Sequence, residues 1–186
     1  MSCQKAQWSV LFCFIVSVFA DAPETVLNPD PSQAPRSRFF CEQSFVNFAW
    51  GYVHKGIYVD DKGGVYRFAY RPGSKPWQPE RGDAPTAQEL EEKYSHGREL
   101  ITTVSAEQLE TVRRWIEDAR KGQLSDPRHT AFDAGSVLTC CYVFDDSTSR
   151  YSLLVLKQEG DYTRENGSPG AVKLTRWLTS LTATSR

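Results

Sequence analysis

The stretch that decides the fold is Gly56–Tyr70, GIYVDDKGGVYRFAY, in which two β-prone runs flank a turn-forming segment. The turn segment DDKGG combines acidic residues with paired glycines, which is typical of a hairpin turn. Alternate side chains of a strand point to opposite faces, so the second arm carries its aromatic residues on a single face: Tyr66, Phe68 and Tyr70. We therefore predict an antiparallel β-hairpin with one aromatic face.

Two further segments extend the predicted sheet. Upstream, Phe45–Trp50 is an apolar and aromatic run that predicts a strand buried on much of both faces. Downstream, SVLTCCYVFDDSTSRYSLLVLKQEG predicts strands at Ser136–Phe144 and Arg150–Gln158 around an acidic, serine-rich turn. Strands joined by tight turns pair antiparallel, so we expect one sheet of about four to five strands built from two hairpins.

The strongest helix signal lies between Ala106 and Lys121. Ser105 precedes this segment as an N-cap, and a glycine follows it. Its apolar residues recur at helical spacing and form one stripe: Leu109, Val112, Ile116 and Ala119. We predict that this stripe packs against the sheet.

Two other segments have helix-start signals. A capping box, Thr86 to Glu89, begins a short helix that ends near Tyr94. Ser168 and the proline after it begin a helix that runs toward the C-terminus. The order of strands and helices predicts an α+β fold, in which two to three helices pack on one face of the antiparallel sheet.

The N-terminus has the pattern of a secretory signal peptide. Lys5 precedes a 13-residue uncharged apolar run, Trp8–Ala20, and the small residues Ala20 and Ala22 fit a signal-peptidase site. This run is shorter than the ~20 residues of a membrane span. We expect cleavage after one of these two alanines. Residues 1–22 would then be the signal peptide, and the mature, extracytoplasmic chain would have no transmembrane span.

Prolines divide the remaining chain. Residues 23–36 contain four of the ten prolines among polar residues, which predicts a flexible leader. Residues 71–85, RPGSKPWQPERGDAP, contain four more and predict a loop. Residues 37–186 are long enough for one hydrophobic core, so we expect a single α+β domain that carries this loop.

Composition excludes several classes of protein. Lys and Arg number 22 and Asp and Glu number 23, so the net charge is -1. A near-neutral chain without a basic run lacks the positive surface that nucleic-acid binding requires. The 40% of hydrophobic residues argues equally against a disordered chain and against a protein with many membrane spans.

Three cysteines remain after the predicted cleavage: Cys41, Cys140 and Cys141. Thiols tend to oxidise outside the cytoplasm, and neighbouring cysteines rarely bridge each other. We therefore expect a disulfide from Cys41 to Cys140 or Cys141. The alternative is three reduced cysteines that pack as small hydrophobic side chains.

No catalytic, metal or cofactor motif is found. The histidines, His54, His96 and His129, are far apart in the chain and lack the spacing of metal ligands. None of them forms a local signature with a cysteine, and the serine-nucleophile motifs GxSxG and SxxK are absent. We predict no catalytic residues, no metal site and no cofactor.

Aromatic residues are the one surplus of this sequence. Those that we single out as partner-binding candidates lie in or beside the first hairpin: Trp50, Tyr58, Tyr66, Tyr70 and Trp77. An apolar sheet face left in water is an aggregation hazard. Residues 71–85, with Trp77, therefore either cover this face or leave it for a partner.

These features predict an exported, secreted or periplasmic, non-catalytic module that binds a protein, peptide or glycan or belongs to the cell envelope. One alternative is an extracytoplasmic hydrolase whose cysteine and histidine site is not marked by local spacing. Another is an inhibitor or immunity-type protein that caps a secreted enzyme, with residues 71–85 as a protruding loop.

Overall fold

The computed structural model describes residues 38–184. The predicted signal peptide and leader lie outside these residues. The described helices are α1 (Ala87–Ser95), α2 (Ala106–Ala119) and α3 (Pro169–Thr184). The strands are β1 (Phe39–Asn47), β2 (Val53–Asp60), β3 (Gly64–Ala69), β4 (Glu99–Thr103), β5 (Arg128–His129), β6 (Ser136–Asp145), β7 (Arg150–Gly160) and β8 (Tyr162–Glu165).

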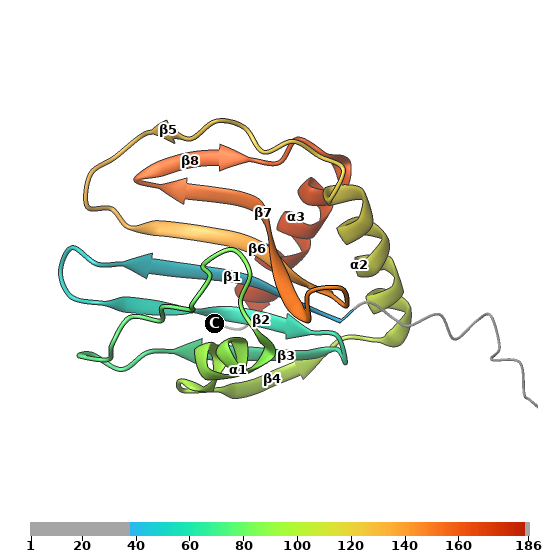
Figure 1. The fold of residues 1–186 in the computed structure, drawn as a ribbon, viewed down its shortest axis with the longest axis horizontal. Helices are drawn as coiled ribbons and strands as arrows, with labels where there is room; N and C mark the ends of the chain where they lie inside the picture. The colour runs from blue at the N-terminus through green and yellow to red at the C-terminus, as the bar shows by residue number, and fades with distance from the viewer. Residues whose placement is uncertain (1–37, 185–186) are drawn as a thin grey trace, which may run out of the picture. The chain divides into compact units, whose positions relative to one another are not determined.

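The strands form one antiparallel sheet in the order β4-β3-β2-β1-β6-β7-β8-β5 (Figure 1). The predicted α+β class and the two hairpins, β2–β3 and β6–β7, are confirmed. The predicted number of strands is wrong, because the described sheet has eight strands. The missed strands β4, β5 and β8 have five, two and four residues and lie toward the sheet edges. Such short, exposed strands need no apolar alternation, so their sequences carry no strand signal.

The strand predicted at Phe45–Trp50 is displaced in the structure. It begins at Phe39 and ends at Asn47, and residues 48–52 form the connection to β2. Phe48 and Trp50 are exposed in this connection instead of buried in a strand. Apolar composition alone could not distinguish a buried strand from an aromatic loop.

The sheet is covered on both faces, which corrects the prediction that all helices pack on one face. One core lies between the sheet and the helices α2 and α3, and it contains Cys41 and Cys141. The other core lies beneath α1 and contains Cys140 and Tyr142, whose side chains point the opposite way. Figure 1 shows α1 in front of β3 and β4, away from α2 and α3. The aromatic face of the first hairpin requires this second cover, because strands that are apolar on both faces must be buried on both.

The helix ends match the capping signals. Thr86 and Glu89 make the reciprocal hydrogen bonds of a capping box at the start of α1. Ser105 accepts a hydrogen bond from the backbone of Gln108 and caps α2, and Ser168 accepts one from Ala171 in α3. Within residues 38–184, no helix is both long and apolar enough to cross a membrane.

The stripe of α2 gives a direct test of this packing. The Ile116 side chain is buried against the sheet, and its truncation to alanine should lower the free energy of unfolding by about 2–5 kcal/mol, because it leaves a cavity. Ser105→Ala should cost about 0.5–2 kcal/mol through loss of the cap. Glu110 lies on the exposed face of α2, so Glu110→Ala should change little. Urea unfolding of the three variants measures these differences. An equal loss for Glu110→Ala and Ile116→Ala would contradict the assigned helix face.

Candidate functional site

The disulfide joins Cys41 of β1 to Cys141 of β6, which lie opposite each other in the sheet. The predicted bridge from Cys41 is confirmed, and the structure selects Cys141 as its partner. Cys140 cannot take this place, because its side chain points to the other face, where its thiol is buried and free. Burial raises the pKa of the Cys140 thiol, which keeps the thiol protonated.

A buried polar network lies beneath α1. The Glu42 carboxylate of β1 accepts a hydrogen bond from the Lys93 ammonium at 2.8 Å and one from the Tyr94 hydroxyl at 2.6 Å. Ser44 donates a third hydrogen bond to Glu42, and Lys93 also donates to the Tyr142 hydroxyl. The Glu42 side chain has no exposed surface and that of Lys93 is 2% exposed. The network therefore attaches α1 to the sheet rather than forming an open site.

Two pKa shifts follow from this burial. Burial alone would raise the pKa of Glu42, but the positive charge of Lys93 and the hydrogen bonds to the carboxylate more than offset it, so the pKa is lowered. Burial lowers the pKa of the neighbouring His54 to about 4, so this histidine is neutral near pH 7. The Tyr52 hydroxyl lies 2.9 Å from Nδ1 of His54. Glu42 and Lys93 are thus a buried ion pair, and His54 is a neutral imidazole held inside the same core.

Residues 71–85 are held against α1 and β7 by hydrogen bonds. The Trp77 indole donates a hydrogen bond to the Glu89 carbonyl, and the Lys93 ammonium lies 4.7 Å from its ring centroid. The backbone carbonyls of Asp83 and Pro85 accept hydrogen bonds from β7. The segment therefore lies against α1 and β7, and Trp77 covers the polar network.

The five aromatic residues predicted to bind a partner differ in their exposure to solvent. Tyr58 and Tyr70 are buried beside α1, with the ring of Tyr58 stacked on Tyr94 at 4.0 Å. Tyr66 and Trp77 are partly buried in the same aromatic core. Trp50 alone is fully accessible, with 88% of its surface exposed.

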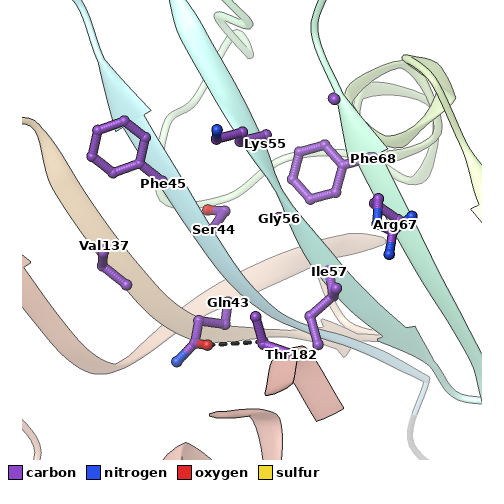
Figure 2. Close-up of a pocket in the computed structure, with 11 residues that line it drawn as sticks. Gln43, Ser44, Phe45, Lys55, Gly56, Ile57, Arg67, Phe68, Val137 and Thr182 are labelled. Atoms are coloured by element: carbon purple, nitrogen blue, oxygen red, sulfur yellow. Dashed lines mark hydrogen bonds between the residues drawn. The ribbon is translucent and has the colours of Figure 1, made fainter. Parts of the chain in front are cut away.

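A groove of about 510 Å³ lies on the opposite face of the sheet, over β1, β2, β3 and the start of β6 (Figure 2). Its floor includes the apolar side chains of Phe45, Ile57, Ala69 and Val137. Gln43 forms one wall: it donates a hydrogen bond to Thr179 and accepts one from Thr182, both on α3 and both at 2.9 Å. The groove is therefore bounded by side chains that are already held in place.

Two cationic side chains line the same groove. Lys55 lies on β2 and Arg67 on β3, and both are exposed. Arg67 also pairs with Glu99 of β4 at 3.1 Å. The eleven lining residues include these two cations and no aspartate or glutamate. The groove thus combines an apolar floor with positive charge.

Another surface lies where the β1–β2 connection meets residues 129–135 and the start of β8. We call this surface the aromatic loop end. Asn47 donates a hydrogen bond to the Asp133 carbonyl across the two loops. The His129 ring contacts those of Phe132 and Tyr162, with centroids 4.3 and 5.3 Å away. Four aromatic residues of the aromatic loop end are exposed, with these fractions of their surface accessible to solvent: Phe48 (65%), Trp50 (88%), Phe132 (85%) and Tyr162 (47%).

A pocket of about 500 Å³ adjoins this end and is lined by residues of both loops, including Phe48 and Asp133. Most of its polar side chains already bond within the chain. Gln158 donates to Ser136 and accepts from Arg164, and Asp161 accepts from the Ala134 backbone. The exposed rings, rather than free polar groups, therefore dominate the chemistry of this surface.

Two of the three histidines stack on one ring. His54 and His96 both stack on Tyr70, with ring centroids 5.1 and 3.9 Å from that of Tyr70, whereas His129 lies on the edge strand β5. Neither the groove nor the loop-end pocket is lined by a histidine or a cysteine. Among residues 38–184, no three histidine, cysteine or acidic side chains gather as metal ligands would.

Sequence reasoning missed the pairing of Glu42 with Lys93 and the exposure of Phe132. A signal was available for the ion pair, since Glu42 is a lone charge in an aromatic strand and Lys93 falls between the core residues Leu90 and Tyr94. For Phe132 there was none, because only the folded loops bring it to the same end as Trp50.

Comparisons with protein-family models, with curated proteins and with solved structures found no match for this chain.

Proposed function

We propose that this protein is an exported, non-catalytic binding module whose partner contacts the aromatic loop end. The observation that carries this proposal is the exposure of four large aromatic side chains from separate segments at one end of the sheet. Exposed apolar patches of this kind mark interaction surfaces. Tryptophan and tyrosine are also enriched among the residues that contribute most to protein–protein binding.

A protein or peptide partner suits this surface better than a glycan. Sugar hydroxyls need free hydrogen-bonding groups beside the aromatic rings. Here Asn47 and Gln158 use both ends of their amides within the chain. The rings themselves offer a large contact area with little entropy to lose, which favours apolar groups of another polypeptide.

Two observations support the remaining parts of the proposal. The disulfide suits an oxidising compartment outside the cytoplasm, in keeping with the predicted signal peptide. The groove and the loop-end pocket are lined by no histidine or cysteine that could serve as nucleophile or base. The buried Cys140 and His54 belong to the core beneath α1 instead.

Site-specific photocrosslinking in the native host tests this proposal. A photoreactive phenylalanine analogue replaces Trp50 or Phe132 in the full-length chain, which keeps the size and apolar character of these exposed positions. We expect both positions to yield the same discrete protein adduct in the extracytoplasmic fraction. Mass spectrometry of the adduct identifies the partner.

Leu100 provides the matched control, because it is a large apolar residue, 56% exposed, on the edge strand β4 at a distance from these loops in the sheet order. The analogue at this position should give no such adduct. Equal crosslinking from position 100, or none from positions 50 and 132, would contradict the proposed surface. Recovery of the intact protein in the cytoplasm would contradict export.

A further inference from the structure

We propose that the sheet groove is a binding site for an amphipathic carboxylate, that is, an apolar chain that ends in a carboxylate group. This site lies over β1–β3 and is separate from the aromatic loop end, so it does not depend on the partner proposed above. The groove between Phe45, Ile57 and Val137 would hold the chain, and Lys55 and Arg67 would hold the carboxylate (Figure 2).

The groove has the size and rigidity of a small-molecule site. Its volume of about 510 Å³ lies within the ~300–1,000 Å³ range of ligand pockets. Ile57 is almost fully buried in the floor, which therefore belongs to the packed sheet. The Gln43 amide is occupied by α3 and by Thr139, so this wall is fixed before a ligand arrives. A preformed apolar floor of this kind reduces the entropy lost on binding.

The charge of the groove selects an anion. Lys55 lies opposite Ala69 in the β2–β3 pair, so Lys55 and Arg67 are diagonal neighbours on one face of the sheet. Diagonal neighbours are close enough for long side chains to approach a common group. Lys55 makes no ion pair with a carboxylate of residues 38–184, and no acidic side chain lines the groove. A ligand carboxylate can therefore accept a hydrogen bond from the Lys55 ammonium, and the Arg67 guanidinium, which keeps its ion pair with Glu99, adds a further N–H donor beside it.

A peptide fits this groove less well than a small amphipathic molecule. Extended peptides bind sheets by adding a strand at an edge, where backbone groups are unpaired. The groove lies instead on the face of β1, β2 and β3, all of which have strand neighbours on both sides. The backbone groups of these strands pair within the sheet, so side chains alone supply the contacts.

Isothermal titration of the purified protein with decanoate tests the proposal. The neutral analogue 1-decanol has the same chain without the charge, and both are used below the concentrations at which they aggregate. We expect one decanoate per chain, bound at least about 10-fold more tightly than the alcohol, because only the carboxylate engages the two cations. The difference should shrink as salt screens the charges.

Substitutions of groove residues test whether decanoate binds in the groove. Lys55→Gln and Arg67→Gln should each weaken decanoate binding by about 3- to 5-fold and leave decanol binding unchanged, as expected for partly exposed ion pairs. Ala69→Trp, which fills the floor, should abolish binding of both molecules. Lys62→Gln is the matched control, because Lys62 is exposed at the tip of the same hairpin and does not line the groove.

Thermal unfolding shows whether each variant remains folded, and the two charge variants decide the question if Ala69→Trp does not fold. Several results would overturn the proposal: no binding of decanoate, equal affinity for decanoate and decanol, or equal loss from Lys62→Gln and Lys55→Gln. Crosslinking from Trp50 is a separate measurement, so failure at the groove and failure at the aromatic loop end can be distinguished.

Discussion

Replacing Lys93 by methionine should lower the free energy of unfolding by about 3–5 kcal/mol, because it leaves the Glu42 carboxylate buried without its cation. The two charged groups lie 2.7 Å apart and are almost completely excluded from water. Glu42→Leu should cost a similar amount, since it leaves the Lys93 ammonium buried among the aromatic rings of Trp77 and Tyr142. Denaturant unfolding of both variants measures these losses.

The double variant Glu42→Leu/Lys93→Met tests whether the loss of stability in each single variant comes from an uncompensated buried charge. Removal of both charges leaves neither one uncompensated, so we expect this variant to be more stable than either single variant. Glu91→Gln is the control on the same helix. Glu91 pairs with Arg98 at 2.8 Å, but its side chain is 65% exposed, and its loss should cost no more than about 1 kcal/mol. If Glu91→Gln and Lys93→Met cost the same, burial of the ion pair has no energetic role.

The loss of unfolding free energy in Lys93→Met should depend on pH. In the native protein the pKa of Glu42 is lowered, so its contribution to stability is complete above the ordinary carboxyl range and is lost as the pH falls through it. Once the carboxyl is protonated, the missing cation no longer matters. The difference in unfolding free energy between Lys93→Met and the native protein should therefore shrink in acid. A constant difference would show that the loss comes from packing alone.

Removing the disulfide should have the other large effect. The bridge from Cys41 to Cys141 spans 100 residues of sequence, and in the chain-entropy model a loop of this length stabilises the folded state by about 4–5 kcal/mol. The double variant Cys41→Ala/Cys141→Ala should lose about this amount, because its unfolded chain is no longer restricted. Urea unfolding of the double variant beside the oxidised native protein measures the difference.

Cys140 provides the control for this prediction. Cys140→Ala should retain the bridge and most of the stability, since Cys140 is a buried free thiol on the other face of the sheet. In Cys141→Ala, Cys140 should not form a replacement bridge in the folded protein, because its side chain points away from Cys41. Peptide mapping without reduction detects the linked peptides. A bridge between Cys41 and Cys140 in the native protein would contradict the observed register of β1 and β6.

Local patterns in the sequence determined the strongest elements. The DDKGG turn between two β-prone runs fixed the β2–β3 hairpin, because paired glycines and alternating side chains act over a few residues. The caps and stripe of α2 fixed its position and buried face for the same reason. The cysteine pattern reduced the disulfide to two pairings. The signal peptide and the export that it implies remain predictions from the sequence.

Only the tertiary structure decided which surfaces are covered and which are exposed. Strand register placed Cys141, and not Cys140, opposite Cys41, and it brought Lys55 and Arg67 to one face. Docking of α1 buried Tyr58 and Tyr70, which by composition are as suitable for binding as Trp50. The physical reason is that the burial of a side chain depends on contacts between segments far apart in the chain. Turns and caps are local, so the sequence could show them, whereas the cover of a sheet face is a property of the assembled fold.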